Sequence, residues 1–156
     1  MAVFEYRQAE EVRDALRRHG VRYLFIGKSA AILLGYPDTT QDADLFVAKD
    51  PENGRALVGA LRELGFRLSP EHEAEIVRGK HFVQLKNGPF DLDLVFAPDG
   101  IECFEDAYKR HVEVEGFPVC HIDDVIASKE ASGLVKDREA LPRLKAFREY
   151  WLERNR

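Results

Sequence analysis

Two aspartates, Asp42 and Asp44, are separated by one residue at the start of an apolar stretch that is typical of a strand. Side chains alternate across a strand, so both carboxylates lie on one face with their Cα atoms roughly 7 Å apart. Like charges this close repel each other, and hard cations such as Mg²⁺ or Mn²⁺ prefer carboxylate oxygens as ligands. The spacing therefore indicates a metal site, with a solvated strand face as the alternative.

A short turn, Gly27-Lys28-Ser29, precedes this pair. It follows an apolar, β-branched and aromatic run at residues 21–26 and leads into an apolar run of helical character at residues 30–34. A Gly-x-Ser turn between strand and helix points backbone N–H groups and a hydroxyl at whatever lies over the helix, which is a natural phosphate site. A plain strand–helix joint is the alternative. If both features are functional, phosphate and metal belong to one site.

A second strand carrying acids is predicted at residues 90–96. Here Asp91 and Asp93 share one face, while the apolar residues at even positions share the other. Beside the Asp42/Asp44 strand, this segment would add a third carboxylate to the cluster. The alternative is a pair of solvated aspartates on an edge strand.

The elements that must position these residues alternate between strand and helix, which indicates an α/β fold. We expect a single domain over residues 1–156, with a mixed sheet of about five strands, helices mainly on one side, and C-terminal helices from about 123 to 153. Residues 71–77 are expected to form a helical turn or a loop crossing the site entrance, and Pro142 implies a late start or a kink in the last helix. The expected strands are 21–26, 42–47, 66–68, 82–85, 90–96 and 117–120, and the expected helices are 7–19, 30–34, 51–64, 102–110, 123–133 and 136–152.

Composition narrows the class of protein. The chain has 156 residues, 45% of them hydrophobic and 33% charged, with a net charge of −5. The acidic balance argues against a general nucleic-acid coat protein. The sequence has no stretch approaching the ~20 apolar residues of a membrane span, and no secretory signal is expected. Cys103 and Cys120 are interpreted as reduced packing thiols, so the expected location is cytoplasmic.

The order of strand, Gly27-Lys28-Ser29-Ala30, short helix and then Asp42-Ala43-Asp44 resembles the nucleotidyltransferase superfamily with the DNA polymerase beta-like palm. The nearest group is that of the small bacterial minimal nucleotidyltransferases and AbiEii-like toxins. The sequence departs from the pattern of that group at two positions: Lys28 replaces a second glycine, and Asp38 stands where arginine is common. A C-terminal pattern of the group is matched by Ser128, Lys129, Gly133, Lys136 and Asp137, with Leu134 in place of an arginine.

The resemblance implies transfer of a nucleotidyl group from an NTP, with Mg²⁺ or Mn²⁺ as cofactor. It implies that Asp42 and Asp44 hold two metal ions. It also implies one acid in the second strand, and the setting of Asp93 fits better than that of Asp91. The implied phosphate-binding residues are Gly27 and Ser29, with Lys28, Lys129 and Lys136 as further candidates. On a continuous helix, Lys129 and Lys136 would share a face, where they would lie as solvated lysines or reach a triphosphate.

Other functions remain open from the sequence. A catalytically weak or inactive member would act by binding a helical protein partner, for example as a toxin–antitoxin component. An aminoglycoside- or lincosamide-modifying enzyme would share the mechanism and differ in acceptor. The sequence does not specify the base of the NTP, the acceptor (RNA, protein or small molecule) or the oligomeric state.

Overall fold

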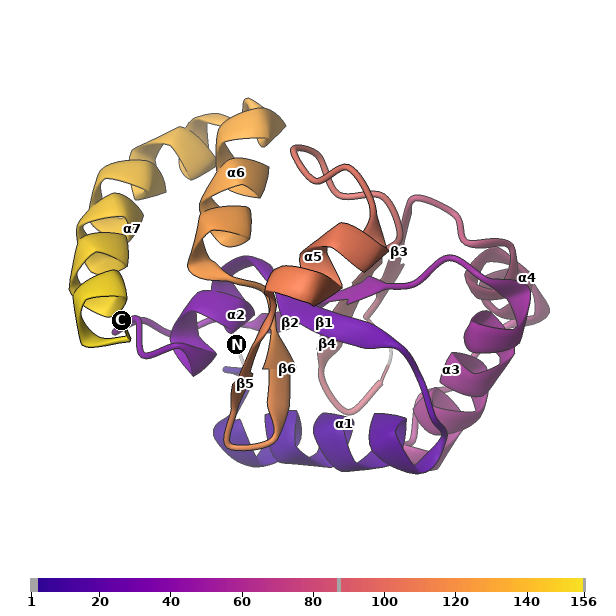
Figure 1. Cartoon of the computed structure of the whole chain (residues 1–156). Coiled ribbons are helices and arrows are strands. Elements are labelled where there is room, and N and C mark those ends of the chain that lie inside the picture. Colours follow the sequence, from indigo (N-terminus) through magenta and orange to yellow (C-terminus); the bar gives the residue numbers. More distant parts are fainter. Residues whose placement is uncertain (1–2, 87, 156) are drawn as a thin grey trace.

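The fold is a six-stranded sheet with seven helices, as seen in a computed structural model that describes residues 3–86 and 88–155 (Figure 1). The strands are β1 (Tyr23–Ile26), β2 (Asp42–Val47), β3 (Phe82–Leu85), β4 (Asp91–Val95), β5 (Val112–Val114) and β6 (Phe117–Val119). The helices are α1 (Tyr6–Arg18), α2 (Gly27–Leu33), α3 (Pro51–Glu63), α4 (Pro70–Arg78), α5 (Phe104–Arg110), α6 (Ile122–Ser132) and α7 (Val135–Arg154).

The sheet is mixed, as expected, with the strand order β3-β4-β2-β1-β6-β5. The pairs β2–β4 and β1–β6 are parallel, and the other three pairs are antiparallel. The register sets Asp42 opposite Asp91 and Asp44 opposite Asp93. On the other side of β2, Asp44 is the register partner of Ile26, the last residue of β1. The end of β1 and the acidic ends of β2 and β4 therefore meet at one place.

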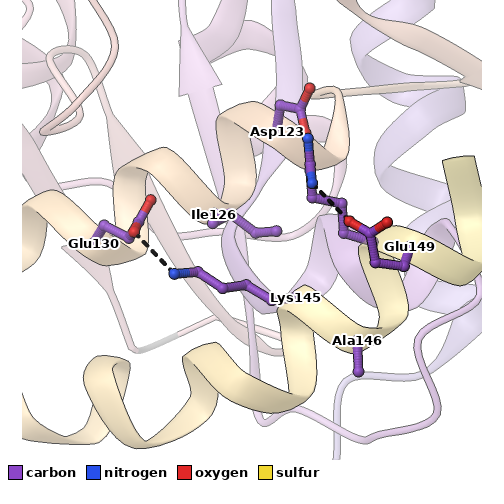
Figure 2. Close-up of a pocket in the computed structure, with 7 residues that line it drawn as sticks. Asp123, Ile126, Glu130, Lys145, Ala146 and Glu149 are labelled. Carbon is purple, nitrogen blue, oxygen red and sulfur yellow. Dashed lines mark hydrogen bonds and ion pairs between the residues drawn. The ribbon is translucent and has the colours of Figure 1, made fainter.

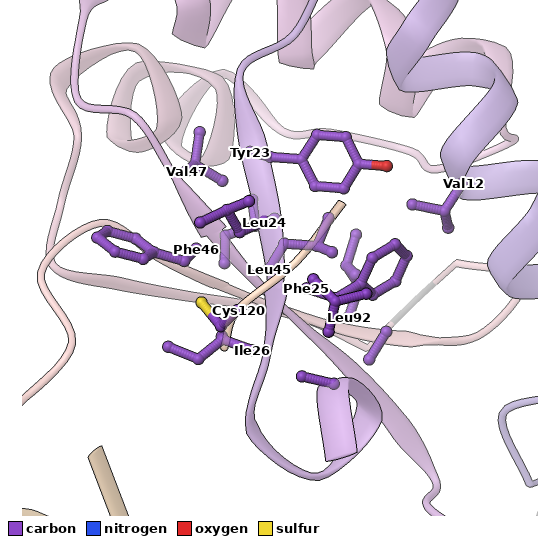
Figure 3. Close-up of a cluster of buried hydrophobic side chains, with 14 of the residues drawn as sticks. Val12, Tyr23, Leu24, Phe25, Ile26, Leu45, Phe46, Val47, Leu92 and Cys120 are labelled. Atoms are coloured by element: carbon purple, nitrogen blue, oxygen red, sulfur yellow. The ribbon is translucent and has the colours of Figure 1, made fainter. Parts of the chain in front are cut away.

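The core lies around β1, whose four residues are all buried (Figure 3). Leu24 and Phe25 of β1 and Leu45 of β2 are fully excluded from solvent. Burial of side chains of this size contributes roughly 1.5–3 kcal/mol each. This apolar packing holds the two central strands together and so fixes where the polar residues at their ends project.

The helices form two groups by their contacts. Helix α3 packs on both α1 and α4, whereas α6 packs on both α2 and α7 (Figure 1). The short helix α2 also packs on β1 and β2. The second group is thus the one attached to the strands that carry Asp42 and Asp44. Among the described residues, no helix combines the length and the apolar character needed to cross a bilayer.

One expected strand is absent, and one observed strand was not expected. Residues 66–68 form no strand: the N–H of Phe66 donates to Leu61 O at the end of α3, and its ring packs edge-on against Phe90. Conversely, residues 112–114 form β5, paired with β6 across a turn in which Glu115 and Gly116 both have positive φ. The hairpin of β3 and β4 has the expected pairing, although Asn87 in its turn lies outside the described residues.

The segment at 71–77 is part of α4, which packs on α3 and so does not cross the entrance to the acidic site. The two helices expected at 123–133 and 136–152 are confirmed as separate elements, so Lys129 and Lys136 do not share one continuous helix. Helix α6 ends at Gly133, which has φ +68°, and α7 starts at Val135. Helix α7 runs through Pro142, so it starts before this proline and not after it.

Candidate functional site

Three carboxylates converge at the shared end of β2 and β4. One oxygen from each of Asp42, Asp44 and Asp93 lies within 4.8 Å of the other two. Asp42 and Asp44 are half-buried, and Asp93 is only 8% exposed. The parallel register explains the convergence, because the Asp-x-Asp segments of the two strands lie side by side. Asp91 lies opposite Asp42 but is not part of the cluster.

The electrostatics of this cluster favour protonation when no cation is present. Burial, followed by the charges of Asp42 and Asp93, raises the pKa of Asp44 well above its usual value. Burial and the charge of Asp42 raise the pKa of Asp93 to about 6. Both effects penalise the ionised form, and a divalent cation placed among the oxygens would reverse them.

The residues present fit a divalent metal. Asp93 Oδ1 is buried and has no hydrogen-bond partner among the described residues, which leaves a ligand atom without a donor. All three groups offer the hard oxygen ligands that Mg²⁺ and Mn²⁺ prefer. Opposite ligands of an octahedral Mg²⁺ are about 4 Å apart, so a span of 4.8 Å needs little contraction.

Only glycine fits at position 27, because of its backbone conformation and its close approach to Asp44. Its φ is +67°, in the left-handed region that favours glycine. A Cβ at this position would also lie 2.5 Å from Asp44 Oδ2. Backbone and acid thus approach each other more closely than any side chain at position 27 permits.

Ser29 joins the turn to the acidic strand. Its hydroxyl donates to Ile26 O at 2.9 Å and accepts from the N–H of Asp44 at 3.1 Å. The residue is 3% exposed. In this conformation the hydroxyl is committed to positioning Asp44, and it does not line the cavity described next.

A cavity of about 860 Å³ opens over the carboxylates. Lys28, Lys129 and Lys136 all line it, although Lys129 and Lys136 come from different helices. The predicted lysines and acids therefore face one space. Thr40 also lines the cavity, and its hydroxyl donates to Asp42 O at 3.0 Å.

Lys28 and Asp38, the two departures from the family pattern, contact each other. Lys28 Nζ lies 3.0 Å from Asp38 Oδ2, and Arg143 approaches the same oxygen at 3.9 Å. The Thr39 N–H, then Lys28, lower the pKa of Asp38. The cation and anion thus compensate each other at the cavity edge.

Lys129 is held by Asp137 from the following helix. Its Nζ lies 3.2 Å from Asp137 Oδ1, and the Ser132 hydroxyl donates to Asp137 Oδ2 at 2.5 Å. Asp137 is only 7% exposed. The sequence pattern included Asp137 without giving it a role, and the role depends on the break at Gly133, which turns α7 back toward Lys129.

Sequence reasoning did not single out Gln84 or Arg143. Gln84 lies opposite Asp93 on β3 and lines the cavity, where it lowers the pKa of Asp93. Arg143 donates to Pro37 O at 2.8 Å and stacks over Tyr36. Neither residue belongs to a local motif, since both are brought in by tertiary contacts.

A second hollow, of about 640 Å³, lies between α6 and α7 (Figure 2). Its charges pair with one another: Lys145 lies 3.2 Å from Glu130, and Arg148 contacts both Asp123 and Glu149. It contains none of the clustered carboxylates, so the acidic cavity is the better candidate for chemistry.

Comparison with known proteins identifies the fold. A crystal structure of a protein from Thermotoga maritima, described provisionally as a nucleotidyltransferase, superimposes with a TM-score of 0.58 and 21% identity. The match covers 91% of this chain and 92% of the other. No family model and no curated protein matches the sequence. The chain has a nucleotidyltransferase-like fold, and its acidic triad lies at the end of two parallel strands of that fold.

Proposed function

We propose that this chain is a metal-dependent nucleotidyltransferase, which transfers an NMP group from an NTP to an acceptor hydroxyl or comparable nucleophile. The observation that carries the proposal is the convergence of Asp42, Asp44 and Asp93 within 4.8 Å, under a cavity that three lysines line. The nucleotidyltransferase-like fold supports it.

The carboxylates of Asp42 and Asp44 would hold Mg²⁺ or Mn²⁺, and Asp93 would complete the metal site. When bound, the metal supplies charge stabilisation for an in-line displacement at the α-phosphate. Asp93 would accept the proton of the attacking nucleophile. Gly27 and Ser29 would serve by fixing Asp44: the glycine leaves room for the carboxylate, and the serine hydroxyl holds the backbone of β2.

Lys28, Lys129 and Lys136 would bind the triphosphate. Ammonium groups act on phosphate as point charges, so they need only approach the cavity and not match a fixed geometry. Lys129 is preorganised by Asp137, whereas Lys28 must share its charge with Asp38. The backbone N–H of Gly27 would also donate to the phosphate.

The test is NTP binding by calorimetry with and without Mg²⁺ or Mn²⁺, for the wild type and an Asp42→Asn/Asp44→Asn double variant. The proposal expects binding that requires metal and that the double variant lacks. An Asp91→Asn variant is the matched control, since it removes a neighbouring strand carboxylate outside the triad. An acceptor screen with α-labelled nucleotide would follow. Absence of binding at millimolar NTP and metal would overturn the proposal.

A second candidate is a catalytically weak protein that acts by binding a partner, such as a toxin–antitoxin component. The Lys28–Asp38 pair favours it, because it neutralises a cation at the cavity edge. The exposed Leu134 and Val135 at the start of α7 also favour it, since exposed apolar side chains gather at contact surfaces. This candidate predicts no pyrophosphate release in the acceptor screen.

A further inference from the structure

A basic hollow lies beyond the opposite end of β1 from the acidic triad. It has a volume of about 200 Å³ and shares no lining residue with the acidic cavity. Ile26, at one end of β1, is the register partner of Asp44, whereas Tyr23, at the other end, lines the basic hollow. The two sites are thus structurally separate.

Three arginines line this hollow: Arg13, Arg17 and Arg22. The one acid in its lining is Glu113, which is paired with His111 at 2.8 Å. Arg13 is engaged by Asp14 at 2.8 Å, and Arg22 by Glu105. For Arg17, the polar contact recorded among the described residues is with a neutral group, the Gly116 carbonyl, at 3.1 Å. Arg17 is thus the arginine of the hollow that has no acidic partner among the described residues.

The second observation is a buried hydroxyl. Tyr23 is 5% exposed, and its oxygen has no hydrogen-bond partner among the described residues. Figure 3 shows this hydroxyl directed away from Phe46 and Val47. A buried polar group without a partner destabilises the fold, so its presence calls for an explanation.

The hydroxyl is a hydrogen-bond donor. Burial raises the pKa of Tyr23, with Arg17 and Arg13 opposing the rise and Glu113 and Asp14 adding to it. The phenol is therefore protonated at neutral pH and suits an anionic oxygen as acceptor. Guanidinium groups bind phosphoryl oxygens through paired N–H donors, which makes arginine the usual partner of phosphate.

We propose that the hollow formed by Arg13, Arg17, Arg22, Tyr23 and Tyr108 is a binding site for a phosphoryl group, independent of the acidic cavity. The guanidinium of Arg17 leaves the Gly116 carbonyl to bind the anion, and the Tyr23 hydroxyl, which is closed off from solvent in this structure, turns toward the hollow to donate to it. The volume equals that of about seven liquid waters at ~30 Å³ each, which accommodates one or two phosphoryl groups.

The experiment is a calorimetric titration with inorganic phosphate, pyrophosphate and a nucleoside monophosphate, in EDTA and at constant ionic strength. Without metal, the acidic triad repels these anions. We expect binding that Arg17→Gln weakens by about tenfold, since hydrogen bonds to charged groups are the stronger ones. Tyr23→Phe is expected to weaken it several-fold. Comparison of the three dissociation constants shows whether the site prefers a free phosphate, a pyrophosphate or a phosphate ester.

Two controls keep the result specific. Arg7 lies on α1, like Arg17, but it is exposed and outside the hollow. Arg7→Ala should therefore leave phosphate affinity unchanged. Asp42→Asn/Asp44→Asn should also bind, because it alters only the other site. Tyr23→Phe should melt no lower than wild type, since it removes an unpartnered hydroxyl. Absence of binding to wild type, or equal binding by wild type, Arg17→Gln and Tyr23→Phe, would overturn the proposal.

Discussion

The ammonium of Lys28 lies 3.0 Å from the carboxylate of Asp38 at the edge of the acidic cavity. Both residues differ from the pattern of the family that the sequence resembles, and the contact shows that the two differences belong together. A cation one position after Gly27 is balanced by an anion in the loop before β2, where the pattern has a cation. The two positions together therefore carry no net charge, where glycine and arginine would carry one positive charge.

This pairing predicts a small effect of Lys28→Ala on stability and a larger one on nucleotide binding. Exposed pairs contribute ~0–1 kcal/mol, and both side chains here are partly exposed, at 41% and 28%. Loss of the cation, which leaves Asp38 with Arg143 at 3.9 Å, should lower NTP affinity by about tenfold at low salt. Calorimetry measures the change in NTP affinity, and thermal melting measures the change in stability. Lys109→Ala, on the exposed face of α5, serves as the charge-matched control. Equal NTP affinity of Lys28→Ala and wild type would contradict the prediction.

Gly27→Ala should destabilise the protein by more than a positive φ alone explains. The left-handed conformation costs roughly 1–2 kcal/mol for a non-glycine residue. At Gly27 the new methyl also meets Asp44 Oδ2. Gly20→Ala isolates the conformational part, because Gly20 has the same φ of +67° and no heavy atom within 4 Å of a built Cβ. Urea unfolding of both variants gives the difference, and equal losses would exclude a contribution from the contact with Asp44.

Ser29→Ala separates a positioning role from a phosphate contact. Loss of the hydroxyl leaves the N–H of Asp44 without its acceptor, which should cost about 1–3 kcal/mol of unfolding free energy. Metal affinity should fall with it, because Asp44 loses its anchor. Ser29→Thr, which retains a hydroxyl, tests whether an oxygen there suffices. A variant of wild-type stability that binds metal normally but binds NTP weakly would instead indicate a direct phosphate contact.

In the metal-free protein, the contribution of Asp44 and Asp93 to stability should fall as pH rises from about 4 to 6. Unfolded aspartate has a pKa of ~3.9, and the folded pKa of Asp93 is about 6, with that of Asp44 also raised. Between these values the folded state binds more protons than the unfolded state, so the raised pKa stabilises the fold at low pH and this contribution disappears at higher pH. For Asp93 the change is up to about 3 kcal/mol.

Unfolding free energies in EDTA across this pH range provide the measurement. Asp93→Asn, which cannot ionise, should flatten the slope, and saturating Mg²⁺ should do the same for wild type by removing the repulsion. A wild-type slope unchanged by Asp93→Asn would contradict the assigned pKa.

Lys129 and Lys136 should respond differently to substitution. Lys129→Ala leaves Asp137 with the Ser132 hydroxyl but without its cation, and loss of a hydrogen bond to a charged group costs about 1.5–3 kcal/mol. Lys136→Ala should leave stability within about 0.5 kcal/mol, as surface changes usually do. Both should weaken NTP binding if both reach the triphosphate. Chemical denaturation measures the stability of the two variants, and calorimetry measures their NTP affinity. Unimpaired NTP binding by both variants would show that neither lysine contacts the triphosphate.

Much of the site's framework could be predicted because it is local. The buried run before Gly27 and the Asp-x-Asp alternation in β2 and β4 depend on nearest neighbours along the chain. The pairing of β2 with β4 is non-local, yet it was predictable in part because each strand presents an acidic face that needs the same cation.

Other features depend on contacts that no local pattern records. The strand β5 has only three residues, and its pairing depends on the turn at Glu115 and Gly116. The Gly-x-Ser pattern predicts a serine hydroxyl that faces a ligand. In the structure the Ser29 hydroxyl is buried and accepts a hydrogen bond from the N–H of Asp44 in β2. By contrast, the helix break at Gly133 is local, and the expected helices at 123–133 and 136–152 already separate Lys129 from Lys136.

The parallel pairing of β2 with β4 has a consequence for folding. Asp44 and Asp93 are brought together only after α3, α4 and β3, which lie between them in the chain, have been accommodated. A cation bound by the triad would act as a reversible cross-link between distant parts of the polypeptide. Since the unfolded chain lacks such a site, an ion at 100 times its Kd would add about 2.7 kcal/mol to global stability. Metal supply would then set the equilibrium stability of the folded protein.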